Sequence, residues 1–425
     1  MSASLPIILD HDLRTPLSAQ IHGAIRDAIQ DGRLAGGARL PSWRDLAAQL
    51  GVARGTVRAA YERLSDEQLI VAHGAAGSRV ADRVPAAPPA GSAIEAQPLP
   101  ELFHDFENPP SPFQMGAPAQ DAFPLVLWSR IMARSARLAA AAPVSYPDPR
   151  GHPELRREIA AYLAIARGVR CAPGRVFVTA GFSGALGLAL HALRLAGASV
   201  WLEDPGFPLT RTAVAFAGLK VVAVPVDEEG IDVAEGARRA PRAALAVVTP
   251  GQQAPLGMTL SLARRQALLE CAARSDAWII EDDYLGELQL AGRAAPALAS
   301  LDSAGRVLLA GTFSKTISPA LRLGFLVVPP QLAPLFATVA ACLAPAPAPT
   351  VQRAVAAFMA EGHYLRHLRR MKRIYAVRRD ALATCLREMA HDGVAIAGSA
   401  ALAVRLRLPD GSKDLDIAAR RGLPR

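Results

Sequence analysis

From residue 113 onward, short runs rich in β-branched residues alternate with longer segments rich in alanine and leucine. The runs include RVFVTAG, SVWLEDPG, LKVVAVPVD, ALAVVTP, AWIIEDD and RVLLAGT. Strands that alternate with helices predict a parallel sheet covered by helices on both faces. Ligands bind such sheets at the carboxyl ends of the strands, where these runs break into Gly-, Ser- or Asp-rich turns. We therefore expect an α/β domain with a site at one sheet edge.

A segment dense in proline, alanine, glycine and serine separates this region from the N-terminal block. Residues 83–112 contain VPAAPPAGSAIEAQPLP and ENPPSP, which cannot hold a regular helix or a central strand. They predict an extended linker. A chain of 425 residues is long enough for more than one core. We expect a small domain at 11–82, the linker at 83–112 and a large domain at 113–425.

The N-terminal block has the pattern of a helix-turn-helix. LPSWRDLA opens with a proline and an N-cap serine and predicts a helix that ends at Leu50. Gly51 and Val52 predict a tight turn, and a second helix is expected from about Arg54 to Leu64. This geometry places the second helix in a DNA major groove. The following LIVAHGAAGSRVAD predicts a wing of two short strands.

On the second helix, Val57, Ala60 and Leu64 share one face and are expected to pack inward. Guanidinium and hydroxyl groups suit phosphates and base edges. The candidate DNA contacts are Arg44, Arg54, Thr56, Arg58, Tyr61 and Arg79. Two other interpretations are that the helices form a core that binds no DNA, and that the charged face is simply solvated. Residues 11–80 hold nine arginines against seven acids, a weak electrostatic footprint.

The ordered pattern PSxRxLAxxLGVxRxTVxxAYxxL, followed by a Gly-rich wing, resembles the GntR-type winged helix from Leu17 to Val80. The resemblance implies a domain that binds double-stranded DNA. Trp43 stands where a serine is usual, and the wing at His73–Arg79 is looser than the usual GSGTFV.

Pyridoxal phosphate (PLP) chemistry needs a lysine for a Schiff base, a carboxylate at the pyridine nitrogen, phosphate donors and a stacking aromatic ring. The chain has four lysines, Lys220, Lys315, Lys372 and Lys413. Lys315 follows the predicted strand RVLLA in a turn of small residues, which suits an imine, whereas Lys220 opens a strand and Lys372 lies in an Arg-rich helix. Ser314 and Arg322 are close enough in sequence to reach a phosphate.

The other requirements are met in the same region. Asp282, at the end of AWIIEDD, is the candidate partner of the pyridine nitrogen, and Tyr284 of the phenolate oxygen. The turn at residues 179–184, with Gly181 and Phe182, predicts a phosphate cradle at a helix N-terminus. Phe207 in EDPGFP can stack on the ring. Each feature alone has an ordinary structural explanation, so the prediction rests on their combination with Lys315.

Taken together, these features resemble the fold-type I aminotransferases, and in particular the MocR group of regulators, which join a GntR winged helix to such a domain. The landmarks occur in order, as FQMGAPAQDAFPLVLW, YPDPRGHPELR, VFVTAG, EDPGFP, VVTPGQQAPLG, IIEDDY and GTFSKTISPALRLG. The resemblance implies PLP on Lys315, with Asp282 at the pyridine nitrogen, Tyr284 at O3′ and Arg322 at the phosphate. Tyr146 matches a tyrosine that reaches the partner subunit's phosphate, which implies a homodimer with shared sites.

The sequence departs from the family pattern in four places. Thr249–Gly257 reads TPGQQAPLG instead of TPSHQxPxG, with Ala254 in place of a larger residue that often contacts cofactor or substrate. Leu285 follows EDDY where an aspartate is usual, and the phosphate turn lacks the usual glutamine pair. These changes suggest an altered effector pocket. The chain stops at RRGLPR, so the small domain is expected to be truncated at the C-terminus and to lack the arginine that pairs with a substrate carboxylate.

Three observations bound the function. The first twenty residues carry Asp10, Asp12 and Arg14 and no apolar run, and no stretch is long enough to span a bilayer, so a cytoplasmic chain is expected. The cysteines show neither metal nor redox spacing, and no metal site is expected. The net charge of +9 permits an anionic partner.

The leading hypothesis is a transcription regulator that senses PLP or a small amine or amino-acid effector through an aldimine on Lys315. One alternative is a working PLP-dependent aminotransferase with an attached DNA-binding domain, although the missing carboxylate arginine speaks against it. The other is a DNA-binding protein whose large domain has lost the cofactor and serves only as a dimerisation module.

Overall fold

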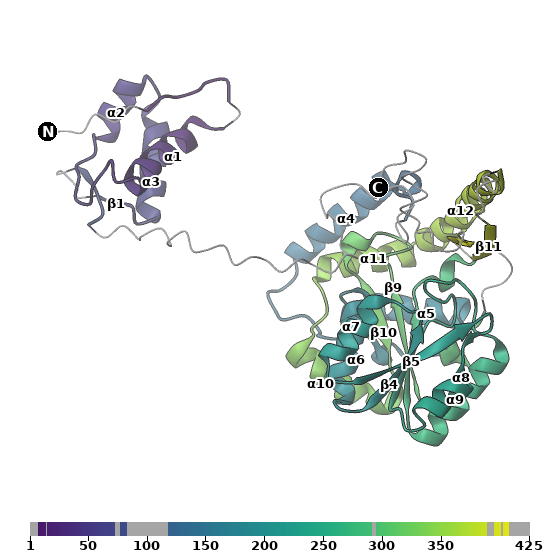
Figure 1. Cartoon of the computed structure of the whole chain (residues 1–425). Helices are drawn as coiled ribbons and strands as arrows, with labels where there is room; N and C mark the ends of the chain where they lie inside the picture. The colour runs from purple at the N-terminus through teal and green to yellow at the C-terminus, as the bar shows by residue number, and fades with distance from the viewer. Residues whose placement is uncertain are drawn as a thin grey trace. The chain divides into compact units, whose positions relative to one another are not determined.

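The computed structural model describes residues 7–13, 15–72, 77–82, 118–290, 295–388, 395–400 and 403–407. The chain divides into two compact units, Met1–Asn108 and Pro109–Arg425 (Figure 1). The expected linker at 83–112 lies outside the described residues, as do residues 73–76 of the expected wing.

The N-terminal unit is a small helical domain with a two-stranded sheet. Its helices are α1 (Leu17–Gln30), α2 (Trp43–Leu50) and α3 (Arg54–Asp66), and its strands are β1 (Ile70–Ala72) and β2 (Ser78–Val80), which pair antiparallel. Ser42 caps α2 by accepting a hydrogen bond from the Asp45 amide, and Gly51 ends it in the left-handed region. The predicted helix-turn-helix and short wing strands are therefore confirmed.

The large unit is built on an eight-stranded sheet in the order β3-β10-β9-β8-β7-β4-β5-β6. The pairs β4–β5, β4–β7, β7–β8 and β8–β9 are parallel, whereas β10 and β6 run antiparallel to their neighbours. The strands are β3 (Val176–Thr179), β4 (Ser199–Asp204), β5 (Lys220–Asp227), β6 (Gly230–Ile231), β7 (Leu245–Val248), β8 (Trp278–Asp283), β9 (Val307–Thr312) and β10 (Gly324–Val327). The predicted mostly parallel α/β sheet is confirmed, and β10 and β6 are additions.

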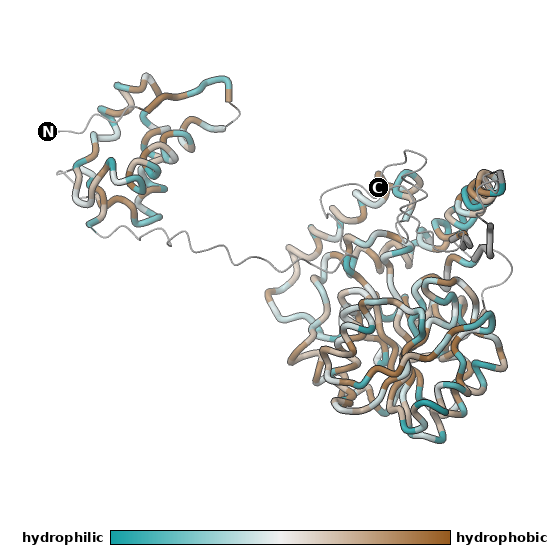
Figure 2. The backbone as a smooth tube through the Cα atoms, in the orientation of Figure 1, coloured by the Kyte–Doolittle hydropathy of each residue, from teal (hydrophilic) through white to brown (hydrophobic). Residues whose placement is uncertain are grey.

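Helices cover both faces of this sheet because alternate strand residues point to opposite sides. Phe177 and Leu308 pack with Phe336 on one face, whereas Val178 and Leu309 pack with the helices of the other. Figure 2 shows the central strands as hydrophobic. The helices are α4 (Leu125–Ala140), α5 (Pro153–Ala166), α6 (Gly181–Leu193), α7 (Pro208–Phe216), α8 (Val233–Arg239), α9 (Leu262–Ser275), α10 (Ala333–Leu343), α11 (Pro349–Ala360) and α12 (His363–Glu388).

The described C-terminal part is a pair of antiparallel strands, β11 (Ala395–Ala400) and β12 (Ala403–Arg407), which lies against α12. The expected truncation of the small domain concerns residues beyond 407, outside the described part of the chain. Within the described ranges, no helix has the length and apolar character that a membrane crossing requires.

Candidate cofactor site and DNA-binding helix

The carboxyl ends of the parallel strands bring the predicted PLP residues to one edge of the sheet. Gly324 at the start of β10 pairs with Thr179 at the end of β3 and with Thr312 at the end of β9. Asp283 at the end of β8 pairs with Gly311. The turns that carry Gly181, Lys315 and Arg322 therefore open on the same edge, at which Asp282 lies near the end of β8, as expected from the sequence.

Lys315 lies in the turn that follows β9. Thr312 shapes this turn, because its hydroxyl accepts a hydrogen bond from the Ser314 amide at 3.1 Å and donates one to the Ser314 hydroxyl at 3.0 Å. Burial lowers the pKa of the Lys315 ammonium, and the nearby Asp282 carboxylate partly offsets this by raising it. A lowered pKa makes the neutral, nucleophilic amine more abundant near neutral pH.

Asp282 is only 8% exposed, and its Oδ1 has no hydrogen-bond partner among the described residues. Burial raises the pKa of this carboxyl well above its usual range, and Asp283 and Glu203 raise it further, while Lys315 lowers it. A buried acceptor without a donor costs about 1–3 kcal/mol, so it is a place where a donor can bind with gain. A protonated pyridine nitrogen is such a donor, and the residues present therefore fit PLP.

Tyr284 lies two residues beyond Asp282 and is half-buried. Burial raises the pKa of its phenol, and the carboxyls of Asp282 and Glu203 raise it further. The hydroxyl therefore keeps its proton at neutral pH and can donate a hydrogen bond to an anionic oxygen.

Sequence reasoning missed Glu203, a buried carboxyl at the end of β4. Glu203 accepts hydrogen bonds from the Thr249 amide at 3.2 Å and the Thr249 hydroxyl at 2.5 Å. Burial raises its pKa. Gln253, part of the unusual TPGQQAPLG segment, donates to the carbonyl oxygens of Pro205 and Ala254 and so joins the turns after β4 and β7. The sequence feature that could have identified Glu203 is an acid at the end of a predicted strand, before PGFP.

A cavity at this edge contains the predicted stacking residue. Phe207 lines it together with Asp282 and Glu203. The other lining residues are Leu202, Gly206, Thr210, Arg211, Val247, Val248 and Thr249. Ring and carboxylate thus border one space, which is the arrangement that a stacked pyridine ring requires.

Three of the predicted phosphate residues lie on two neighbouring turns, one that opens α6 and one that precedes β10. Gly181 begins α6 with φ +70°, and a Cβ at the adjacent Gly324 would lie 3.0 Å from the Gly181 backbone, so both turns pack closely. The first amides of α6 have no partner within the helix and can bind an anion. Phe182 is half-buried in this first turn, and Arg322, in the turn before β10, is exposed with φ +45°.

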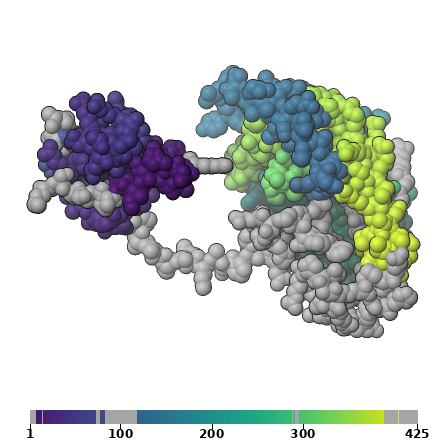
Figure 3. Space-filling model, turned by 90° about the horizontal axis from the view of Figure 1, so that it is seen from above, coloured from purple at the N-terminus to yellow at the C-terminus, as the bar shows by residue number. Residues whose placement is uncertain are grey.

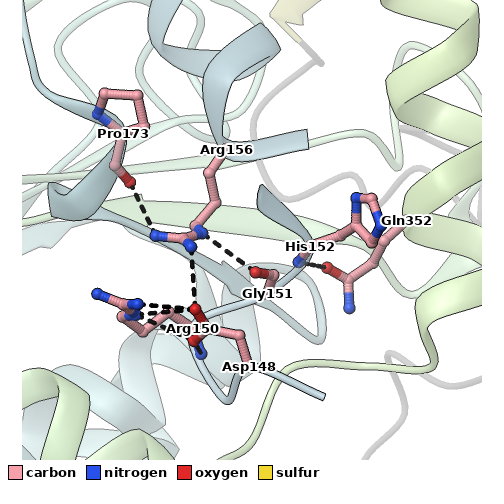
Figure 4. A network of polar contacts seen from close by, with 7 residues as sticks. All are labelled: Asp148, Arg150, Gly151, His152, Arg156, Pro173 and Gln352. Atoms are coloured by element: carbon pink, nitrogen blue, oxygen red, sulfur yellow. Dashed lines mark hydrogen bonds and ion pairs between the residues drawn. The ribbon is translucent and has the colours of Figure 1, made fainter. Parts of the chain in front are cut away.

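Tyr146 is 101% exposed and touches no part of the site within its own chain. The segment that follows it is fixed by a polar network (Figure 4). Asp148 accepts hydrogen bonds from the guanidinium groups of Arg150 and Arg156, and Arg156 also donates to the Gly151 carbonyl. Gly151 has φ +107°, and a Cβ there would lie 2.4 Å from Val178. The Val178 amide in β3 donates to the Arg150 carbonyl oxygen at 2.8 Å and so anchors this loop to the sheet, while Tyr146 itself is exposed.

The predicted recognition helix carries two of the candidate DNA-contacting arginines. Arg54 and Arg58 are exposed on α3, and Arg58, 67% exposed, pairs with Glu62 at 2.8 Å. Thr56 is half-buried on the same helix. The side chains flanking the helix are held in place, because Arg44 stacks on Trp43 at 4.9 Å and Arg79 donates to the Gly37 carbonyl at 3.0 Å.

Tyr61 corrects one prediction. We expected it to point outward, but it is 6% exposed, and its hydroxyl donates to the Pro41 carbonyl oxygen at 2.8 Å. Tyr61 follows Val57 by four residues and precedes Leu64 by three, so helical periodicity places it on the inward face. It joins α3 to the start of α2 and is not available to a base edge.

Within the described residues, no group of His, Cys, Asp and Glu could hold a metal ion. The cysteines Cys171, Cys271, Cys342 and Cys385 are free thiols.

The fold and the site define a class of protein: a GntR-type winged helix joined to a fold-type I, PLP-dependent aminotransferase domain. Residues 17–80 match the family of bacterial regulatory proteins, gntR family, and residues 125–419 match aminotransferase class I and II. The chain belongs to the MocR family of HTH-type transcriptional regulators. The cofactor of its large unit is PLP.

Three known proteins illustrate the relationship. The probable rhizopine catabolism regulatory protein MocR of Rhizobium meliloti is 38% identical, over 90% of this chain and 80% of that protein. The pyridoxine biosynthesis transcriptional regulator PdxR of Corynebacterium glutamicum is 32% identical, over 92% and 83%. The α-aminoadipate aminotransferase LysN of Thermus thermophilus, solved with N-(5′-phosphopyridoxyl)-L-leucine, is 27% identical with a TM-score of 0.64, over 72% of this chain and 79% of that one.

Proposed function

We propose that this regulator holds PLP on Lys315 and changes its DNA binding in response to PLP or to a small amine or amino-acid effector. The observation that carries the proposal is that Asp282, which is close enough to Lys315 to affect its pKa, is buried at the same sheet edge with its Oδ1 unpartnered among the described residues. When bound, PLP supplies an electrophilic carbonyl carbon that an amine effector can attack in place of Lys315.

In this proposal each residue of the site has one role. Lys315 supplies the attacking amine, Asp282 binds the pyridine nitrogen, Tyr284 donates to the phenolate oxygen and Phe207 stacks on the ring. Phosphate binding is assigned to Gly181, Phe182, Ser314 and Arg322, and to Tyr146 of a second subunit. The supporting facts are the burial of Asp282 and Tyr284, the exposed guanidinium of Arg322 and the cavity lined by Phe207.

We also propose that the chain is a cytoplasmic homodimer with domains at 11–82 and 113–425 joined by the linker 83–112. Exposed large apolar side chains support a dimer, because such side chains are rarely left in water together. They are those of Tyr146, its neighbour Val144, and Leu125 and Val126 on α4. Sedimentation velocity of the full chain tests the stoichiometry, and a monomer at micromolar concentration would contradict it.

DNA binding is assigned to Arg54, Thr56 and Arg58 on α3, together with Arg44 on α2 and Arg79 on β2. An effector can shift the DNA equilibrium only if it binds two arrangements of the dimer with different affinity. Arg58→Ala should weaken operator binding about tenfold without changing PLP uptake, because it removes one guanidinium from the proposed groove face. Unchanged operator affinity would argue against α3 as the recognition helix.

The experiment that tests the cofactor assignment is borohydride reduction of the full chain after incubation with PLP, followed by peptide mass mapping. We expect a pyridoxyl adduct on Lys315 and none in Lys315→Ala. Lys220→Ala, which removes an exposed lysine at the start of β5, is the matched control and should keep the adduct. A folded wild-type protein without the adduct would leave a DNA-binding dimer with a relic enzyme domain.

A further inference from the structure

Most of the net positive charge of the chain is concentrated in α12. Residues 363–388 hold seven arginines and Lys372 against Asp380 and Glu388, a net charge of +6 out of +9 for the whole chain. The winged-helix residues 11–80, with nine arginines against seven acids, carry +2. The charge that attracts a polyanion at long range thus lies mainly outside the recognition domain.

The helix has an inner and an outer side. Tyr364, Leu368 and Met371 are buried in the core of the large unit. Arg369, Arg370 and Arg373 are exposed, and their spacing of one, three and four residues places them on one stretch of helix surface. We call these three arginines the α12 basic face. Figure 3 shows α12, in yellow, on the outside of the large unit.

Among the described residues, no carboxylate neutralises the charges of the α12 basic face. Farther along the helix, Arg378 pairs with Asp121 and Arg379 with Asp380. For Arg369, Arg370 and Arg373, no carboxylate among the described residues lies within ion-pair distance; Arg373 reaches only the carbonyl oxygen of Arg369, at 3.5 Å. Repulsion among three such neighbours costs free energy, so a polyanion that binds there relieves it.

We propose that the α12 basic face binds the phosphate backbone of double-stranded DNA. Guanidinium groups bind phosphate oxygens in a bidentate fashion, and four helical residues rise about 6 Å, a length of duplex axis that carries about three to four phosphate charges. Because the recognition domain contributes little net charge, this face supplies sequence-independent attraction while α3 supplies specificity. The inference rests on the proposed function, in that the chain must bind DNA.

The test is the salt dependence of binding by the full chain to a fluorescently labelled duplex of mixed sequence, several helical turns long. The variant is Arg369→Ala/Arg370→Ala/Arg373→Ala. The matched control, Arg238→Ala/Arg242→Ala/Arg274→Ala, removes the same charge from exposed positions on and near α8 and α9. Circular dichroism and PLP adduct formation on Lys315 check that all three proteins are folded.

If all three arginines contact phosphates, the slope of log affinity against log salt becomes shallower by about 2 to 3 in the variant. The affinity lost between about 50 and 200 mM salt then shrinks by about 40-fold relative to wild type. The control should keep the wild-type slope. An unchanged slope in the variant, or an equal change in the control, overturns the inference.

Three further outcomes distinguish failure of this inference from failure of the proposed function. If Arg58→Ala weakens binding while the triple variant keeps the wild-type slope, only the role of α12 is overturned. A wild-type chain that binds no duplex overturns both. A triple variant whose slope is unchanged but whose sedimentation coefficient falls would assign the face to a second copy of the chain, which also overturns the proposal.

Discussion

His367 on α12 donates a hydrogen bond from Nε2 to the backbone carbonyl oxygen of Thr316, at 2.7 Å, and Thr316 directly follows Lys315. A carbonyl oxygen only accepts, so Nε2 carries the proton. The ring is buried against Phe123 and Phe358, and burial lowers its pKa. The neutral imidazole therefore joins the lysine turn to the helix that carries the α12 basic face.

His367→Phe should weaken this junction. Phenylalanine keeps the ring packing but loses the donor, so we expect the free energy of unfolding to fall by about 1–3 kcal/mol and the Lys315 turn to loosen. Urea unfolding measures the first effect, and the rate of borohydride-trapped PLP attachment to Lys315 measures the second. His367→Gln, which retains a donor, should recover part of the attachment rate. His191→Gln, at an exposed position on α6, should change neither; a normal attachment rate in His367→Phe would contradict the positioning role.

Asp282→Asn should have opposite effects on stability and on cofactor binding. In the cofactor-free chain it removes a buried carboxyl that lies near Asp283 and Glu203, so the unfolding free energy should rise by about 1–2 kcal/mol. Loss of the charged acceptor should weaken PLP binding about 10- to 100-fold. Thermal unfolding and PLP titration give the two values.

The control for Asp282→Asn is Glu228→Gln, which neutralises an exposed acid between β5 and β6 and should change neither quantity. A variant that binds PLP as tightly as wild type would show that another group holds the pyridine nitrogen.

Tyr61→Phe tests the corrected role of that residue. Removing the hydroxyl leaves the Pro41 carbonyl without its donor, so the N-terminal unit should lose about 1 kcal/mol or more of stability, while DNA affinity under folding conditions should stay within about twofold. Fluorescence anisotropy with the operator measures the DNA affinity, and thermal unfolding measures the stability. Arg54→Ala, on the exposed face of the same helix, should show the reverse pattern. An affinity loss in Tyr61→Phe equal to that in Arg54→Ala would restore a direct contact.

Local sequence predicted most of the sheet and of the site edge for a physical reason. Buried parallel strands need continuous β-branched runs, so β4, β5, β7, β8 and β9 are visible as such, and Lys315 and Asp282 follow directly from where two of these runs end. Lysine is also scarce in this chain, and its four lysines leave few candidates for the Schiff base.

What sequence could not predict depends on long-range packing. The strand β10, with only GFLV, is defined by its neighbours β3 and β9, and Gly311 is required because a Cβ there would lie 2.2 Å from the Phe325 ring. Glu203 acquires its partners from Thr249 and Gln253, some fifty positions away in the chain. The prediction for Tyr61 was wrong because its hydroxyl has an acceptor, the Pro41 carbonyl oxygen, 20 positions away in the chain. This long-range hydrogen bond allows the polar side chain to lie on the inward face that helical periodicity gives it.

The pH dependence of the rate of PLP attachment to Lys315 should reflect the groups that surround this lysine. Only the neutral amine attacks, so the rate should rise as the pH rises through the pKa of Lys315. Burial lowers this pKa, and the rise should therefore occur at lower pH than for an exposed lysine, whose pKa is about 10.4. Asp282 opposes the shift, so Asp282→Asn should move the midpoint to still lower pH, whereas Glu228→Gln should leave it in place. Stopped-flow absorbance across the pH range gives the midpoints. A wild-type midpoint at the value of an exposed lysine, or a shift to higher pH in Asp282→Asn, would contradict the burial of Lys315 and the electrostatic effect of Asp282 on it.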